Sequence, residues 1–182
     1  MIEFTLSALA RAQKAMKLSE HLVDLLQNAV DALAKHVLIM VSAEGEGKIS
    51  LTVQDDGEGI KPEEAEKALR GEKAPRGRGL ALLKKSAEEK GGSLVFGSEG
   101  KGSTVVASWL RPEMGAIGDS ILVFWQEFGI MDFTLSMTSP KGVFVFDSRL
   151  VAEKYGDPRD FQTMVKVRKD INYAQTNLYG GI

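Results

Sequence analysis

DDGEGI, at residues 55–60, directly follows a run of alternating apolar residues that predicts a β-strand. An acid at the end of a strand, followed by two glycines one residue apart, lets the backbone approach a planar ligand closely. The carboxylate of Asp55 can then accept a hydrogen bond from an exocyclic amine of that ligand. The alternative is a tight Asp-Gly turn that binds nothing. The motif therefore indicates a binding site only if other residues support it.

The helix predicted before this motif carries a polar stripe beside its apolar face. Apolar residues recur at helical spacing between residues 19 and 35, with Ser19 as the expected N-cap. Four polar residues share one face of this helix: Asp24, Asn28, Asp31 and Lys35. Asp and Asn disfavour a helix interior because their side chains compete for backbone hydrogen bonds. The stripe is either a solvated face or one wall of a site.

Two further glycine-containing stretches lie downstream of the motif. RGRGLALLKK, at residues 76–85, places Gly77 and Gly79 before an apolar helix, and Arg76 and Arg78 add positive charge. Unpaired N–H groups at a helix N-terminus bind phosphate, and glycines permit close approach. GKGST, at residues 100–104, lies at a turn that enters a strand. Each stretch alone is weak evidence, since a flexible, basic helix start explains the first one as well.

The order of elements predicts an α/β fold. The expected elements are a helix at 19–35, strands at 37–41 and 48–53, helices at 62–70 and 80–90, and strands at 93–97 and 103–110. Pro62 followed by two glutamates suits the first turn of a helix. We expect a two-layer sandwich, with the helices on one face of a mixed sheet.

A second pattern begins after Arg111-Pro112, where the glycines at 115 and 118 indicate a linker. Strands are expected at 132–137 and 142–147, and helices at 148–155 and 160–174. We therefore divide the chain into an N-terminal domain, 1–111, and a small α+β appendage, 112–182. The appendage shows no cluster of titratable residues, and we expect it to bind a protein partner or a second copy of the chain.

Composition excludes several classes of function. The 182 residues are 43% hydrophobic and 26% charged, which is typical of a globular protein. A formal net charge of -2 gives no reason to expect nucleic acid as a partner. The chain has no cysteine, which excludes disulfides and thiolate metal sites. No apolar run approaches the roughly 20 residues that span a bilayer, so we expect a cytoplasmic protein without a membrane segment.

Taken together and in this order, the four stretches resemble the ATP-binding domain of histidine kinases, the MutL mismatch-repair protein, DNA gyrase and the heat-shock chaperones, the GHKL superfamily. DLLQNAVDA, at 24–32, resembles the Asn-bearing helix motif of that family. DDGEGI resembles its first glycine box, the stretch from RGRGLALLKK to KGG its second, and GKGSTV its closing strand. The resemblance covers about residues 15–110 and predicts the histidine-kinase-like ATPase fold.

The resemblance implies roles for individual residues in binding ATP and Mg²⁺. Asn28 would hold Mg²⁺ at the phosphates, and Asp55 would accept the adenine amino group. The other residues implied in ATP binding are Asp31, Gly57, Gly59, Ile60, Gly77, Arg78, Gly79, Leu80, Ser103 and Thr104. Either Ser103 or Thr104 would complete the adenine pocket, and the match of GKGSTV to the closing strand of the family favours Ser103.

This sequence departs from the family at two places. Hydrolysing members usually have Glu at the position of Asp24, the candidate catalytic base. Asp is one methylene shorter, and a general base must reach the proton that it accepts. The loop RGEKAPRG, at 70–77, is short beside the nucleotide lid of most histidine kinases. Lid closure is therefore expected to be small or to depend on a partner.

Three hypotheses of function follow. The leading one is an ATP-binding regulator with slow or no hydrolysis, which acts as a nucleotide switch. The second is a protein kinase acting in trans on a serine or histidine of a partner, as the anti-sigma-factor kinases do. The third is a binding module with a degenerate nucleotide site. His21 and His36 are the only histidines and are expected to be structural or surface residues, which disfavours a self-phosphorylating kinase.

Overall fold

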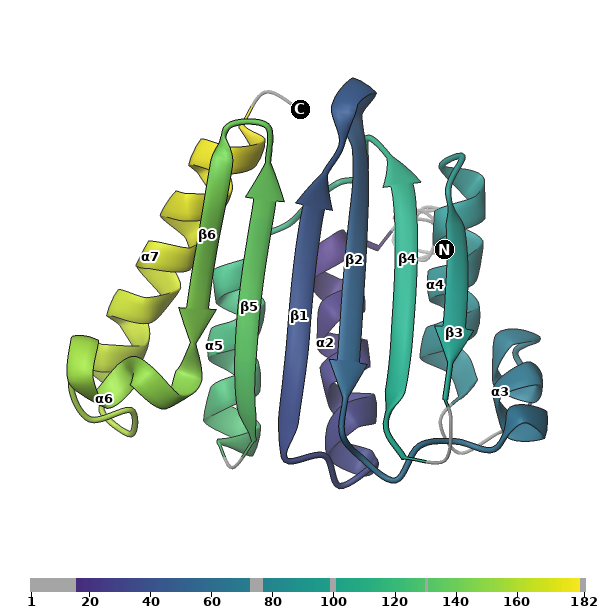
Figure 1. Ribbon diagram of the computed structural model, residues 1–182, viewed down its shortest axis with the longest axis horizontal. Helices are drawn as coiled ribbons and strands as arrows, with labels where there is room; N and C mark the ends of the chain where they lie inside the picture. The colour runs from purple at the N-terminus through teal and green to yellow at the C-terminus, as the bar shows by residue number, and fades with distance from the viewer. Residues whose placement is uncertain (1–15, 73–76, 99–100, 130, 181–182) are drawn as a thin grey trace, which may run out of the picture.

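A mixed sheet of six strands forms one layer of the molecule, and helices cover one face of it (Figure 1). The computed structural model describes residues 16–72, 77–98, 101–129 and 131–180. The helices are α2 (Leu18–Asp31), α3 (Pro62–Leu69), α4 (Gly77–Glu89), α5 (Ile117–Phe128), α6 (Val151–Lys154) and α7 (Phe161–Tyr179). The strands are β1 (His36–Ala43), β2 (Lys48–Asp55), β3 (Ser93–Gly97), β4 (Ser103–Leu110), β5 (Asp132–Ser139) and β6 (Gly142–Asp147). Short 3-10 turns cover Gly45–Gly47 and Ser148–Leu150.

The strand order across the sheet is β3-β4-β2-β1-β5-β6. β1 and β5 run parallel, with Ile39 opposite Leu135, and the other neighbouring strands are antiparallel. The segment after residue 111 therefore extends the same sheet, as Figure 1 shows. The boundary placed between residues 111 and 112 falls in the connection from β4 to α5.

Alternate residues of the strands bury one face of the sheet beneath the helices. In β1 the buried residues are Val37, Ile39, Val41 and Ala43, and the residues between them are only partly buried. Leu22 and Leu26 of α2 are fully buried against this layer. A continuous apolar core joins these residues to Trp109 of β4 and to residues of α5 and α7. This alternation in strands and 3.6-residue spacing in helices explain the two layers.

The connection after β4 holds the N-terminus of α2. The carbonyl oxygens of Glu113 and Met114 accept from the N–H groups of Leu18 and Ser19, each at 2.9 Å. These bonds satisfy two of the amides that a helix leaves unpaired at its start. The N-cap is Lys17, so the prediction of Ser19 was wrong. Backbone carbonyls from a distant part of the chain do what a capping side chain would otherwise do.

Helix α5 was missed because its glycines were interpreted as a linker. It packs between α2 and α7, and side chains of α7 cap its N-terminus. Gln175 Oε1 accepts from the N–H of Ile117 at 2.9 Å, and Asn172 Oδ1 accepts from the N–H of Gly118 at 2.8 Å. A Cβ on Gly118 would lie 2.5 Å from the carbonyl oxygen of Arg168. The glycine therefore permits close helix packing and does not mark a turn.

The other elements agree well with the sequence analysis. The predicted two-layer α/β sandwich with helices on one face of a mixed sheet is confirmed. Pro62 is the first residue of α3, as expected. The predicted helix at 148–155 is a 3-10 turn followed by the short α6. The helix predicted at 160–174 is α7, with Asp160 as its N-cap, and it continues to Tyr179.

Candidate functional site

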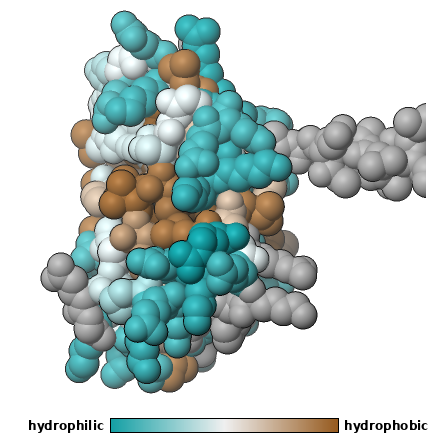
Figure 2. Space-filling view, turned by 90° about the vertical axis from the view of Figure 1, so that its right-hand side faces the viewer, coloured by the Kyte–Doolittle hydropathy of each residue, from teal (hydrophilic) through white to brown (hydrophobic). Residues whose placement is uncertain are grey.

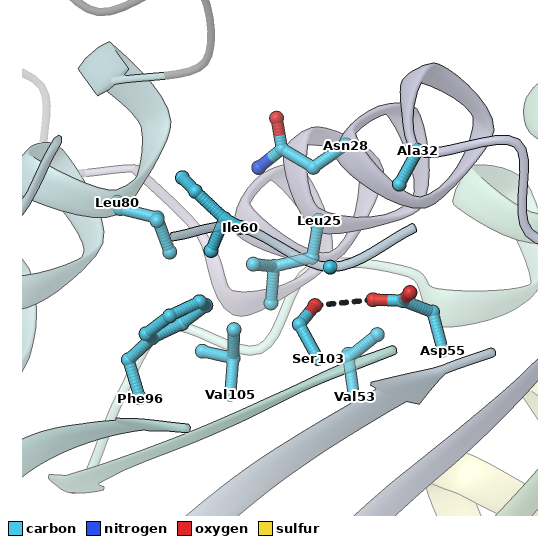
Figure 3. A pocket seen from close by; sticks show the side chains of 11 residues that line it. Leu25, Asn28, Ala32, Val53, Asp55, Ile60, Leu80, Phe96, Ser103 and Val105 are labelled. Atoms are coloured by element: carbon cyan, nitrogen blue, oxygen red, sulfur yellow. Dashed lines mark hydrogen bonds between the residues drawn. The ribbon is translucent and has the colours of Figure 1, made fainter. Parts of the chain in front are cut away.

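A cavity opens between α2, the loop after β2, the start of α4, and strands β3 and β4 (Figure 3). It encloses about 470 Å³, counting its open mouth. The residues that line it come from distant parts of the sequence: Leu25, Asn28, Ala32, Val53, Asp55, Gly59, Ile60, Leu80, Phe96, Ser103 and Val105. Mostly apolar walls with a few polar groups among them are typical of a site for a small organic ligand.

Asp55 is the acidic residue of this cavity, and two hydrogen bonds fix its carboxylate. Oδ1 accepts from the N–H of Gly57 at 2.9 Å, and Oδ2 accepts from the hydroxyl of Ser103 (Figure 3). The second bond follows from the sheet, because Asp55 and Ser103 are register partners in β2 and β4. Two carboxylate oxygens offer about four acceptor positions, so the group can still accept from a ligand.

The adjacent acid, Asp56, has a different role. Its Oδ1 accepts from the N–H groups of Lys35 and His36, at 2.8 and 2.9 Å, and so ties the end of β2 to the start of β1. These backbone hydrogen bonds, led by that from His36, hold the pKa of Asp56 below its usual value. Asp56 does not line the cavity. Of the two aspartates in the motif, only Asp55 lines the cavity.

Glycines let the loop after β2 lie closer to its neighbours than side chains would allow. A Cβ on Gly57 would lie 2.6 Å from the carbonyl oxygen of Ala32. Gly59 has a φ of +75°, which residues with a side chain rarely adopt. The carbonyl of Gly57 also accepts from the N–H of Gly102, at 2.6 Å. The glycines thus set where the carboxylate of Asp55 lies.

Ser98, just after β3, joins the same two loops through its side chain. Its hydroxyl accepts from the N–H of Ile60 at 3.1 Å and donates to the carbonyl of Gly102 at 2.8 Å. Sequence reasoning missed this residue, since a serine after a strand is common in any turn. Ser98 holds the loop that forms one edge of the cavity.

Apolar side chains form the walls of the cavity. Phe96 and Val105 lie along one side, while Leu25 and Leu80 lie along the other (Figure 3). Figure 2 views the molecule from the side of β3, α3 and α4, where apolar surface gathers between hydrophilic regions. A slot of this kind can bury the faces of a planar ring. Sequence reasoning missed five wall residues, because ordinary core periodicity explains them equally well: Leu25, Ala32, Val53, Phe96 and Val105.

Polar groups of α2 lead from the cavity toward the start of α4. Asn28 lines the cavity, and Asp24 lies one helical turn earlier. A Cβ on Gly79 would be 3.6 Å from Oδ2 of Asp24, so the first turn of α4 lies directly against this acid. Burial, together with the nearby charge of Glu20, raises the pKa of Asp24. A carboxylate with a raised pKa is a better proton acceptor.

Asn28 offers one neutral oxygen to a hard cation. Mg²⁺ is usually held by one or two protein oxygens together with phosphate and water, which this donor fits. Within the described ranges, no three His, Asp or Glu residues form a group that could bind a metal ion. The residues thus fit a magnesium ion that phosphate brings with it, and they do not form a dedicated protein cage.

The structure brings most of the predicted site residues together. Those that line the cavity are Asn28, Asp55, Gly59, Ile60, Leu80 and Ser103. Asp24, Gly57 and Gly79 lie beside it. Thr104 borders a second hollow that shares Asp55 and Ser103 with the first. Asp31, the last residue of α2, is exposed and accepts from the side chain of Gln27 at 2.9 Å.

Part of the predicted phosphate-binding stretch lies outside the described residues. Gly77 and Arg78 open α4, but the structure does not describe the Arg78 side chain. Arg76 and the rest of 73–76 lie outside, as do residues 99 and 100 of the GKGST stretch.

The chain matches the model of a known protein family over the residues that form the cavity. Residues 13–114, more than half of the chain, match the histidine kinase-, DNA gyrase B- and HSP90-like ATPases. The chain belongs to this family. The resemblance of the four motifs is thereby confirmed, and the family supports nucleotide binding by this chain. The cavity described above lies wholly within the matched residues.

Two solved structures resemble this chain. The crystal structure of the N-terminal domain of a DNA repair protein is 15% identical over 92% of this chain and 58% of that one, with a TM-score of 0.54. This likeness shows the fold. The crystal structure of full-length ShkA in complex with AMPPNP is 25% identical over 52% of this chain and 21% of that one, with a TM-score of 0.40. The chain thus spans less than two thirds of either one.

No curated protein matches the chain. In the part of the chain that the structure describes, no helix combines the length and the apolar character needed to cross a bilayer.

Proposed function

We propose that this chain is a regulatory protein that binds Mg-ATP and ADP, hydrolyses ATP slowly or not at all, and acts as a nucleotide-dependent switch. One observation carries the proposal: the carboxylate of Asp55 is held by Gly57 and Ser103 at the wall of an apolar cavity. We assign it to cytoplasmic signalling, with residues 112–182 as a contact surface for a protein partner.

The adenine ring is the part of the ligand that fits the cavity. Its amino group would donate to Asp55, while Phe96 and Leu80 would cover the ring. Guanine carries a carbonyl oxygen where adenine carries this amine, and that oxygen would face a carboxylate without a hydrogen bond. A buried polar group left unpaired costs about 1 to 3 kcal/mol. The site should therefore select adenine nucleotides over guanine nucleotides.

The phosphates would extend toward Asn28 and the first turn of α4. The N-terminus of α4 supplies unpaired N–H groups and the positive end of the helix dipole. Asn28 would hold the magnesium ion, which neutralises phosphate charge when it is bound. Gly77 and Gly79 open this helix and leave its backbone accessible to the phosphates.

Asp24 limits hydrolysis in this proposal. Its raised pKa favours proton acceptance, but its side chain is one methylene shorter than that of glutamate. A misplacement of about 1 Å can cost on the order of a hundredfold in rate. Slow turnover would keep ATP bound for long enough to serve as a signal.

The switch would operate at the contact between α4 and α2. The first turn of α4 lies against Asp24, so a γ-phosphate that enters here must contact or displace that turn. ATP and ADP would consequently leave α4 in different states. Hydrogen exchange measured with Mg-ADP and with a non-hydrolysable ATP analogue tests this, with α7 as the internal control. We expect exchange in α4 to differ between the two ligands, and equal exchange would contradict the switch.

A protein kinase acting in trans is the second candidate. His21 is 1% exposed and stacks on Trp109, with ring centroids 6.1 Å apart, so it is not accessible as a phosphoacceptor. This observation excludes His21 as an acceptor, and the trans reaction would use a serine or histidine of a partner. Transfer of label from γ-labelled ATP to a second protein would select the kinase over the switch.

A further inference from the structure

The hydroxyl group of Ser98 joins two segments that border the candidate site. Ser98 is half-buried, follows the last residue of β3, and does not itself line the cavity. Its hydroxyl accepts from the N–H of Ile60 and donates to the carbonyl of Gly102. A serine hydroxyl has one proton to donate and two lone pairs that accept, so it can make both bonds at once. One side chain therefore ties the loop after β2 to the turn before β4.

Both bonds act on residues that form the cavity wall or directly precede one that does. Ile60 itself lines the cavity. Gly102 directly precedes Ser103, whose hydroxyl donates to the carboxylate of Asp55. Figure 3 shows the side chain of Ile60 apart from the hydrogen-bonded pair of Asp55 and Ser103, and all three residues border the same cavity. A change at Ser98 would thus reach the cavity through two separate segments.

The turn at Gly102 packs directly against the end of β2. Its N–H donates to the carbonyl of Gly57 at 2.6 Å. The φ angle of Gly102 is +73°, and a Cβ there would collide with the carbonyl oxygen of Asp55. The bond from Ser98 fixes the carbonyl of this same glycine. The two polar groups of Gly102 together set where the hydroxyl of Ser103 meets the carboxylate of Asp55.

Removal of the Ser98 hydroxyl would leave two backbone groups without this partner. The N–H of Ile60 and the carbonyl of Gly102 would have to bond to water instead, because an unpaired backbone group is costly. The two segments would then no longer be tied to each other. A ligand that binds between them would have to order them, and that ordering lowers affinity.

We propose that Ser98 is a positioning residue for the adenine base, an inference that rests on the nucleotide binding proposed above. Ser98 does not touch the ligand. It acts through Ile60 and through the pair of Asp55 and Ser103, which together border the place of the base. The phosphates would bind to Asn28 and α4, and neither hydrogen bond of the Ser98 hydroxyl goes to those elements. The effect of Ser98 is therefore confined to the base.

Calorimetry with adenosine, ADP and Mg-ATP tests this assignment. A hydrogen bond inside a protein contributes up to about tenfold to an equilibrium constant, so Ser98→Ala should weaken all three ligands by the same factor, about fivefold to tenfold. Ser98→Thr keeps the hydroxyl and should bind within about twofold of the wild type. Ser93→Ala is the matched control, because Ser93 is the first residue of the same strand and lies outside the cavity. It should bind all three ligands as the wild type does.

A double-mutant cycle separates positioning from a general loss of stability. If Ser98 acts through Asp55, the addition of Ser98→Ala to Asp55→Asn should weaken binding by much less than the product of the two single losses. Residues that act independently would instead multiply their losses. That result, in variants that thermal unfolding shows to be folded, would overturn the proposal.

Amide hydrogen exchange tests the same hydroxyl in the free protein. The amide of Ile60 should exchange faster in Ser98→Ala, while that of Glu58, which donates to the carbonyl of Ala32 at 2.8 Å, should keep its rate. An unchanged rate at Ile60 would overturn the proposal. A wild type that binds none of the three ligands would reject the proposed function itself. Wild-type affinity in Ser98→Ala, beside a wild type that binds, would reject only the role of Ser98.

Discussion

Replacement of Asp55 by asparagine changes the charge and the hydrogen-bonding groups of the cavity wall but not its shape. One arm of the amide can still accept from the N–H of Gly57, as Oδ1 does now at 2.9 Å. The other arm becomes an NH₂ donor, which then faces the hydroxyl of Ser103 and the amino group of adenine. The new NH₂ group and the adenine amino group are both hydrogen-bond donors, so they would repel each other, whereas the carboxylate of Asp55 accepts from that amino group.

The expected loss of affinity follows from that exchange. A hydrogen bond to a charged group contributes about 1.5 to 3 kcal/mol. Since 1.4 kcal/mol corresponds to a factor of ten, Asp55→Asn should weaken ATP and ADP binding by roughly ten- to a hundredfold. Isothermal titration calorimetry with each nucleotide measures this loss directly.

Asp56→Asn is the matched control, because it makes the same chemical change one residue away. Its oxygen can still accept from the N–H groups of Lys35 and His36, and it does not line the cavity. ATP affinity should stay within about twofold of the wild type. If Asp55→Asn binds ATP as tightly as the wild type, Asp55 does not bind the base. Equal losses in both variants would point to a general disturbance of the loop.

Three further predictions concern α2. Asn28→Ala should weaken Mg-ATP binding about tenfold or more but change adenosine binding by no more than about twofold, by calorimetry; equal losses would indicate a damaged fold. Asp24→Glu should raise phosphate release at nearly constant ATP affinity, whereas a brisk wild type that slows on substitution would contradict the proposed role. Burial lowers the pKa of His21 below its usual value of 6.5. The imidazole therefore binds a proton more readily in the unfolded chain than in the folded one, and the free energy of unfolding decreases as the pH drops through about 6.5. His21→Phe should reduce this pH dependence in urea unfolding, and an unchanged slope would show that His21 does not cause it.

Much of the candidate site could be predicted because its residues follow local rules. Asp55 ends a strand whose alternation is plain in the sequence, and the structure places Gly57 close to the backbone of Ala32, whereas the sequence analysis expected close approach to a ligand. Asn28 stands in a polar stripe on an amphipathic helix. By contrast, Phe96 and Val105 obey the same periodicity as any core residue, so their position in the cavity has no local signal. These two side chains line the cavity only because β3 and β4 pack beside the loop at residues 55–60.

The features that the sequence analysis predicted wrongly or missed depend on contacts between distant segments. Ser19 resembled an N-cap, but carbonyl oxygens almost 100 residues away take that role. Gly118 resembled a linker residue, yet its lack of a side chain serves the contact with Arg168 of α7. The parallel pairing of β1 with β5 likewise joins strands that no local pattern connects. Each of these features depends on the tertiary fold, which periodicity and turn residues do not encode.

The fate of the γ-phosphate distinguishes a nucleotide switch from an ATPase and from a protein kinase. Purified protein is incubated with γ-labelled ATP and Mg²⁺, with and without cell lysate, and the label is separated into intact ATP, free phosphate and labelled protein. We expect the purified protein to bind ATP and leave it mainly intact, and to add neither free phosphate nor labelled protein to what the lysate alone produces. Rapid release of phosphate, transfer of label to another protein, or failure to bind ATP would contradict a slowly hydrolysing nucleotide switch.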